Sequence, residues 1–396
     1  MLSTQAPARP QIPIAPVISS ASFRRAGLAR LPTVLDAGAA KLVTSGRVAI
    51  ALALREMGVG AGDKVLVPAW HSPSMVPPVL WRGAEPVFYR LHADASVDLA
   101  DLAAKIDGAT RAVMVTHYFG FHQDVKRVRA LCDARGVQLL EDCAHCFIGE
   151  YEGRPVGSYG DYAIASSMKF FPIYEGGVLA SARHDLAGVA LRTAGAGFEA
   201  KIALTSLENG FVYGRLPALH AALWLPLRLK SFAWSLVKAR RAAGAPGSLA
   251  PDSSDSSFNL DPNWIDKRSS WFARAMLRLV SARRIAAQRR AHYQRLDEAL
   301  ARMPGVRPLF ARLPEGVCPW VYPLVASDPE GLFARLQAAG VPVVRFGQPL
   351  WEGVDERVCA NSVALARSVL SLPCHQELRA DELDWLIDSA RRALTA

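Results

Sequence analysis

The amino-acid sequence predicts an α/β fold, with a mostly parallel central sheet flanked by helices and a smaller C-terminal α+β domain. Short apolar runs typical of buried strands alternate with segments of helical periodicity along the first half of the chain. Such alternation favours a parallel sheet that helices cover on both faces. The chain has 396 residues, 51% of them hydrophobic, which is enough for two domains and a large core.

The elements of the central sheet are predicted in chain order. Strand-like runs cover residues 64–67, 86–89, 112–116, 137–141, 161–165 and 178–181. Apolar residues recur at helical spacing between the second and third runs, at Leu99, Leu102, Ala103 and Ile106. The same spacing predicts a helix over residues 125–132, which Gly136 ends.

The last third of the chain predicts the smaller domain. A strand-like run covers residues 320–325, followed by a helix over 332–339, a strand over 341–345 and a C-terminal helix over 381–394. We therefore divide the chain into an N-terminal segment (1–40), a large domain (41–285) with a basic insertion at about 215–270, and a small C-terminal domain (286–396). The sequence contains no internal repeats.

Lys169 is the most informative residue. It follows the apolar run 161–165 and the hydroxyl residues Ser166 and Ser167, and a Glu-Gly-Gly turn comes after it at 175–177. Burial among small apolar residues depresses the pKa of a lysine, and such an amine forms Schiff bases with carbonyl compounds. Most lysines are solvated surface charges, so this segment is informative only together with others.

Asp142 stands at the carboxyl end of the strand predicted at 137–141. Ligands bind at the carboxyl ends of strands in open parallel sheets, and a carboxylate there can pair with a protonated ring nitrogen of a cofactor. A helix cap or a solvated turn would explain the same residue.

Two further segments carry weaker signals. Ser45 is a helix N-cap followed by Gly46 and Arg47, and the amides and dipole at such a helix start attract phosphate, although any capped helix looks alike. The strand predicted at 64–67 leads into Trp70 and His71, whose rings could stack on a flat cofactor or simply pack in the core.

In this order and spacing, the four segments resemble the DegT/DnrJ/EryC1/StrS family of pyridoxal phosphate (PLP)-dependent aminotransferases, mostly sugar aminotransferases of fold type I (the aspartate aminotransferase superfamily). The likeness is close over residues 40–182. A weaker similarity to the family continues in the arginine-rich helix at 283–296 and in the run 369–375.

The resemblance implies roles for individual residues. Lys169 holds PLP as a Schiff base, and Asp142 pairs with the pyridine nitrogen of the cofactor. His145 lies near its phenolic oxygen. Ser166 binds the phosphate together with the backbone of Gly46 and Arg47. No metal is implied.

The chain also departs from the family pattern. Arg47 stands where the family usually has Thr, and the family's stacking aromatic falls near Ser72, so His71 or Trp70 takes that role. The stretch before Lys169 is about two residues short, which leaves Ser166 and Ser167 as alternatives at the phosphate. Asn209 is a weak candidate for the family's Asn that enters the partner's site.

Composition agrees with an intracellular enzyme. Six cysteines without framework spacing predict reduced thiols in a cytosol. Cys143 and Cys146 flank His145 without a second ligand pair, which makes a poor zinc site. The sequence shows neither a signal peptide of the usual apolar type nor the ~20 apolar residues of a membrane-spanning helix, and we expect a cytoplasmic location.

The formal net charge of +10 lies in one region. Residues 215–290 hold fourteen Lys and Arg against four Asp. Within residues 219–243, aromatic and apolar residues alternate with basic ones, which is typical of a helix on an anionic membrane, of an interface element that attracts a nucleotide-sugar, or of an insertion with a solvated basic face. No nucleic-acid-binding motif accompanies the charge. A Pro/Ser/Asp-rich linker follows at 244–263.

We therefore expect a homodimeric PLP-dependent aminotransferase that moves an amino group from an amino acid, with L-glutamate as the expected donor, to a nucleotide-linked keto-sugar. The product would serve surface polysaccharide or secondary-metabolite biosynthesis. The alternatives are a PLP-dependent sugar dehydratase of the same family, in which histidine replaces the lysine, and a non-catalytic homologue that binds a sugar or a membrane. Arg47 and Arg345 could each meet a carboxylate or phosphate, or could form surface salt bridges.

Overall fold

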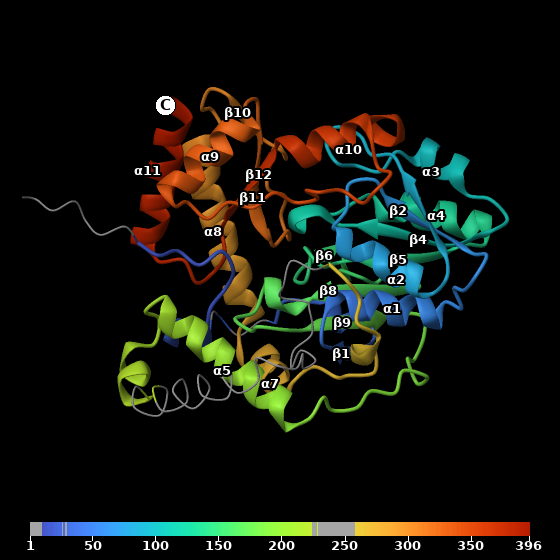
Figure 1. Cartoon of the computed structure of the whole chain (residues 1–396), viewed down its shortest axis with the longest axis horizontal. Helices are drawn as coiled ribbons and strands as arrows, with labels where there is room; N and C mark the ends of the chain where they lie inside the picture. The colour runs from blue at the N-terminus through green and yellow to red at the C-terminus, as the bar shows by residue number, and fades with distance from the viewer. Residues whose placement is uncertain (1–9, 26, 28–29, 224–227, 229–257) are drawn as a thin grey trace, which may run out of the picture.

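The computed structural model describes residues 10–25, 27, 30–223, 228 and 258–396 (Figure 1). Within these residues the chain forms a seven-stranded sheet in the order β1-β9-β8-β5-β4-β2-β3, a three-stranded sheet in the order β10-β11-β12, and a hairpin of β6 (Glu150–Tyr151) and β7 (Arg154–Pro155). The strands of the large sheet are β1 (Ala39–Val43), β2 (Lys64–Pro68), β3 (Glu85–Tyr89), β4 (Thr110–Thr116), β5 (Gln138–Asp142), β8 (Tyr162–Ser166) and β9 (Gly177–Ser181).

The large sheet is mostly parallel. Strands β3, β2, β4, β5 and β8 pair in parallel, whereas β9 runs antiparallel to both β8 and β1. The predicted fold class is therefore confirmed, and each of the six predicted strands has a counterpart; β1 was not predicted. In the register of the sheet, Asp142 on β5 lies beside Thr116 on β4 and Ile164 on β8. The ends of three strands thus converge where Asp142 stands.

Helices cover both faces of this sheet (Figure 1). Side chains cap the starts of three of them: Ser45, as predicted, and also Asp98 and Asp124 accept backbone N–H groups at the starts of α1, α3 and α4. Gly136, with φ of 65°, ends α4 as predicted. The helices of this part are α1 (Gly46–Glu56), α2 (Val76–Trp81), α3 (Leu99–Lys105), α4 (Val125–Arg135), α5 (Ala196–Val212) and α7 (Trp271–Leu279).

The C-terminal part is built on the small sheet of β10 (Val306–Pro308), β11 (Val321–Ala326) and β12 (Val369–Pro373), which is antiparallel. Its helices are α8 (Ala282–Leu300), α9 (Pro329–Ala339), α10 (Glu356–Ser368) and α11 (Ala380–Thr395). The strand predicted at 341–345 was wrong. Only Val344 forms an isolated bridge, to Ser371 on β12, and Pro342, two residues before Val344, has no N–H to donate to a ladder.

The predicted domain division at 285/286 falls inside α8. One hydrophobic cluster contains Leu66 and Val113 of the large sheet together with Tyr322 and Leu383 of the C-terminal part, so the two parts pack tightly against each other. Most of the basic segment 219–243 lies outside the described residues, as does most of the linker 244–263. Among the described residues, no helix is both long enough and apolar enough to cross a membrane.

Gly177, at the start of β9, allows a close approach that positions α1. A Cβ built at Gly177 would lie 2.3 Å from the carbonyl carbon and oxygen of Ser45 and 2.8 Å from the amide nitrogen of Gly46. These are backbone atoms at the start of α1, which cannot move aside without moving the helix. The residue at this position must therefore be glycine for α1 to begin where it does.

We expect Gly177→Ala to lower the free energy of unfolding by at least about 3 kcal/mol, because the added methyl group overlaps backbone. Denaturant unfolding measures the change. Gly60→Ala is the matched control: its Cβ would meet nothing within 4 Å, so we expect the stability to stay within about 1 kcal/mol of the parent. Equal stabilities of the two variants would contradict the close approach.

Candidate functional site

A cavity of about 210 Å³ opens at the carboxyl ends of β5 and β8, beside the first turn of α1. This is the edge where ligands bind in open α/β sheets. Segments far apart in the sequence contribute to its wall. The lining residues are Ser45, Gly46, Arg47, Ile50, Ser72, Ser74, Met75, Asp142, Ala144, His145, Ile164, Ser166, Met168, Lys169, Phe258 and Phe346.

Lys169 ends a 3₁₀ turn, Ser167–Lys169, that follows β8 directly. Its Nζ lies 4.7 Å from the centre of the Trp320 ring, and its backbone carbonyl accepts a hydrogen bond of 2.7 Å from Arg289. Burial lowers the pKa of Lys169 to about 8, while the charge of Asp142 acts in the opposite direction. The amine is therefore neutral in a much larger fraction of molecules near pH 8 than an ordinary lysine.

Asp142 ends β5 and is 5% exposed. Its carboxylate accepts hydrogen bonds from the amide of Ala144 at 2.9 Å and from the hydroxyl of Thr116 at 3.3 Å. Burial raises the pKa of Asp142, and these two donors and the charge of Lys169 oppose that rise. The site thus pairs a buried acid with a buried amine, each of which favours the charged form of the other.

The first turn of α1 brings backbone amides to the cavity. Ser45 caps the helix by accepting the N–H of Val48 at 3.2 Å, and the first amides of a helix have no acceptor within the helix. Gly46 lines the cavity, and a Cβ built on it would meet none of the described residues within 4 Å. Ser166 lines the same cavity. Hydroxyl, amides and helix dipole together suit an anion such as a phosphate group.

His145 lines the cavity but is only 2% exposed. Its ring stacks on Trp320, with ring centres 4.0 Å apart and an interplanar angle of 23°. Burial holds the pKa of His145 well below its usual range, so the ring is neutral. Within the described residues its Nδ1 has no hydrogen-bond partner. A buried polar atom without a partner, beside a cavity, is ready to bind a polar group of a ligand.

Neither His71 nor Trp70 is among the residues that line the cavity, and their stacking role stays a prediction. The Nδ1 of His71 lies 3.0 Å from the carbonyl of Ala69, and its ring stacks on Phe88. Trp70 donates its indole N–H to the carbonyl of Phe346 at 3.1 Å. Both side chains are fully buried, because core contacts on either side of the loop after β2 hold them.

The structure also shows which of the other residues singled out in the sequence line the cavity. Of the two serines before Lys169, only Ser166 lines the cavity. Asn209 lies near the end of α5 and is not among the lining residues. Arg345 also lies outside that lining and pairs with Glu330 at 2.7 Å, the salt-bridge role that the sequence left open.

Sequence reasoning missed two aromatic residues of the lining, Phe258 and Phe346. It also missed Arg289, which is fully buried on α8 and donates to the carbonyl of Lys169. The arginine-rich character of residues 283–296 was visible, but the contact of one arginine with the lysine loop depends on packing. Phe258 follows a Pro/Ser/Asp-rich stretch, so nothing in its neighbourhood indicates a site residue.

Among the described residues, one cluster has metal-ligating side chains close together: His117, Glu141 and Cys143, whose ligand atoms lie within 4.8 Å of one another. The carboxylate of Glu141 already accepts the amides of Tyr159 and Gly160 and lies 3.1 Å from the Nε2 of His117. The hydrogen bonds of the Glu141 carboxylate are therefore satisfied by protein groups without a metal ion.

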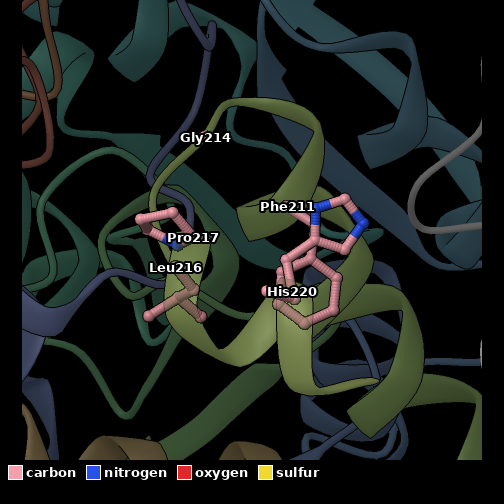
Figure 2. Close-up of a pocket in the computed structure, with 6 residues that line it drawn as sticks. Phe211, Gly214, Leu216, Pro217 and His220 are labelled. Carbon is pink, nitrogen blue, oxygen red and sulfur yellow. The ribbon is translucent and has the colours of Figure 1, made fainter. Parts of the chain in front are cut away.

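A different cavity, of about 410 Å³, lies at the end of α5 and contains none of the predicted site residues. Figure 2 shows the rings of Phe211 and His220 lying face to face there, with centres 4.8 Å apart and an interplanar angle of 11°. Among the described residues that line this cavity, His220 is the only titratable one. Its lining is that of an apolar surface hollow and offers no catalytic chemistry.

The residues around the cavity that contains Lys169 fit PLP. The amine of Lys169 suits the aldehyde of the cofactor, the carboxylate of Asp142 suits a protonated ring nitrogen, and the open start of α1 suits its phosphate. The unpartnered Nδ1 of His145 suits a polar substituent of the ring. The chemistry of the donor set therefore agrees with the cofactor that the sequence resemblance implies.

The lowered pKa of Lys169 predicts how cofactor attachment depends on pH. Only the neutral amine attacks an aldehyde, so the rate of covalent attachment of PLP to the apoprotein should rise up to pH about 8 and level off above it. The amine of Nα-acetyl-lysine, the control, should still gain reactivity at pH 10, because its pKa is about 10.4. Growth of the visible absorption band measures both rates. A protein rate that rises tenfold per pH unit between pH 9 and 10 would refute the lowered pKa.

Comparison with known proteins gives independent evidence. The GDP-perosamine synthase of Vibrio cholerae is 36% identical over 133 residues, which are 33% of this chain and 35% of that protein. The L-glutamine:scyllo-inosose aminotransferase of Streptomyces griseus is 35% identical over 153 residues, 38% of this chain and 35% of that protein. These matches thus span about a third of the length of the curated relatives.

Solved structures share the fold over most of the chain. DesV of S. venezuelae, in complex with a ketimine intermediate, matches with a TM-score of 0.63 and 21% identity, covering 92% of this chain and 87% of that chain. The model of one family, described as the DegT/DnrJ/EryC1/StrS aminotransferase family, matches residues 29–245, more than half of the chain. The resemblance seen in the sequence is thereby confirmed, and the chain belongs to the DegT/DnrJ/EryC1/StrS aminotransferase family.

Proposed function

We propose that this protein is a PLP-dependent aminotransferase that transfers the amino group of an amino acid, L-glutamate, to a keto-sugar linked to a nucleoside diphosphate. The observation that carries the proposal is the pairing of a lysine of lowered pKa with a buried aspartate in one cavity, at the positive end of α1. The names of the relatives, which act on sugars and inososes, support the acceptor class. The product would enter surface polysaccharide or secondary-metabolite biosynthesis.

PLP, when bound, supplies a ring that accepts the electrons released when the α-carbon of the amino donor loses its proton. Lys169 would hold the cofactor through its amine, and the same amine, when free, would be the base that takes the proton from the α-carbon of the donor. Its neutral amine near pH 8 suits that task. Asp142 keeps the ring nitrogen protonated, which is what makes the ring accept electrons.

The remaining residues bind and orient. The amides of Gly46 and Arg47 and the hydroxyl of Ser166 would bind the phosphate, and the unpartnered Nδ1 of His145 would bind a polar substituent of the ring. In the second half-reaction the same groups act in reverse order on the keto-sugar, and Lys169 returns the proton. Assembly as a homodimer, a cytoplasmic location and membrane contact through residues 219–243 stay predictions.

The test is the visible absorption spectrum of the purified protein before and after addition of L-glutamate. We expect a band from the lysine-bound cofactor that L-glutamate bleaches, with release of 2-oxoglutarate. A band that L-glutamate and L-glutamine both leave unchanged would refute the transfer reaction. The absence of any band after incubation with PLP would refute the cofactor as well.

The acceptor class is tested by product analysis. Protein loaded with L-glutamate should convert a nucleoside-diphosphate-linked 4-keto sugar to the amino-sugar and regain its original band. The corresponding free keto-sugar is the control for the nucleotide. Loss of the sugar's hydroxyl without gain of nitrogen would instead indicate the dehydratase alternative.

A further inference from the structure

Residues 258–260 return to the start of α1 from a distant part of the sequence. The Nη1 of Arg47 donates a hydrogen bond to the backbone carbonyl of Asn259, and Arg47 is 8% exposed. In Figure 1 the gold segment that leads to the small helix before α7 runs past α1. One guanidinium in the first turn of α1 therefore holds a segment that lies more than 200 residues further along the chain.

Phe258, next to the bonded carbonyl, lines the same cavity as Gly46 and Lys169. Its φ of 45° lies in the left-handed region, which a residue with a large side chain rarely adopts. Such a conformation persists only where the surroundings determine it. The hydrogen bond from Arg47 to the adjacent residue is one contact of that kind.

The location of this contact indicates which end of the cavity Phe258 bounds. Arg47 is the second residue of α1, so the segment it holds lies beside the amides that suit a phosphate. Among the described residues, nothing lies within 4 Å of a Cβ built at Gly46, and Phe258 lines the same cavity as Gly46. A side chain beside these amides would narrow the space through which a phosphate held there leaves.

We infer that Arg47 is a positioning residue that acts through the backbone of Asn259 and holds Phe258 as a wall at the phosphate end of the cavity. The chain thereby covers this end of its own cofactor site and retains the cofactor. The inference rests on the proposed function for the identity of the ligand. The contact between Arg47 and Asn259 does not depend on that identity.

The experiment measures the binding of pyridoxamine 5′-phosphate, which carries the phosphate but forms no bond with Lys169. We expect Arg47→Ala and Phe258→Ala each to raise the dissociation constant by roughly tenfold, since each removes the same wall. If Arg47 acts through Phe258, the two changes are coupled, and the double variant binds no more weakly than Arg47→Ala. Tryptophan fluorescence follows the titration.

Three controls make the result specific. Arg55→Ala removes another arginine of α1, one that pairs with Glu56, and should leave the dissociation constant unchanged. Pyridoxamine, which lacks the phosphate, should bind the parent and Phe258→Ala equally. Arg47→Lys, which can still donate to the carbonyl, should recover part of the affinity.

Two outcomes would overturn the inference. An unchanged affinity of Phe258→Ala for pyridoxamine 5′-phosphate would show that Phe258 does not act as a wall. Strictly additive effects of the two substitutions would show that Arg47 does not act through Phe258.

Hydrogen exchange of the apoprotein tests the contact without any ligand. Amides of residues 258–264 should exchange several-fold faster in Arg47→Ala than in the parent, and should be unaffected in Arg55→Ala. Equal exchange in Arg47→Ala and the parent would refute the positioning role. If the parent binds no pyridoxamine 5′-phosphate, the proposed function fails, and the exchange data still decide whether Arg47 positions this segment.

Discussion

Replacement of Lys169 by alanine should abolish transamination while the protein still binds the cofactor non-covalently. The amine both holds the cofactor and moves the proton of the amino donor, and no other lysine lines the cavity within the described residues. We expect kcat to fall by at least about 10³-fold, since a positioned base alone contributes about 10²–10⁴-fold. Release of 2-oxoglutarate from L-glutamate measures the loss.

Two controls distinguish the loss of the Lys169 amine from misfolding of the variant. Lys169→Ala should keep its affinity for pyridoxamine 5′-phosphate within a few-fold, because the helix amides and Asp142 remain. Lys105→Ala, a change on α3 that removes a salt bridge with Asp101, should keep full turnover. Turnover retained in Lys169→Ala would refute the mechanism.

Replacement of Asp142 by asparagine has the second largest expected effect. Asparagine keeps the shape and still accepts the amide of Ala144, but it cannot hold a proton on the ring nitrogen. The ring then accepts electrons poorly, and we expect kcat to fall by about 10²–10³-fold, the scale of losing one preorganised electrostatic partner. Single-turnover kinetics with L-glutamate measure this step directly.

The same substitution should change the titration of Lys169. The charge of Asp142 raises the pKa of the lysine, whereas burial lowers it. Removing the charge leaves burial unopposed, so the pH at which cofactor attachment levels off should move below 8. Asp384→Asn, an exposed acid of α11 that pairs with Arg295, is the control and should change neither quantity. An unchanged midpoint in Asp142→Asn would show that the two groups do not interact.

The main parts of the site were predictable because they are local to strand ends. Asp142 follows an apolar run and Lys169 follows another, and parallel strands bring their carboxyl ends to one edge of the sheet. Periodicity and capping residues therefore placed the amine, the acid and the first turn of α1 near one another. The order of these segments was also enough to indicate the family.

His71 shows the limit of that reasoning. The sequence places it in the loop after β2, beside the cavity, but not the direction of its ring. Contacts with Phe88 and with the carbonyl of Ala69 turn the ring into the core, and these contacts depend on how β3 packs against β2. The strand predicted at 341–345 failed for a related reason: apolar composition alone does not show how many residues can pair, and only Val344 bridges to β12.

The sequence by itself determined the fold class and the family, and its short-range patterns singled out four residues that the structure places around one cavity: Lys169, Asp142, Ser45 and Gly46. Only the tertiary structure decided the rest of the wall. Phe258, Phe346 and Arg289 reach the site from segments that lie at least 80 residues away along the chain from Lys169. Their positions result from packing and hydrogen bonds between distant segments, and these long-range contacts leave no periodic signal in the local sequence.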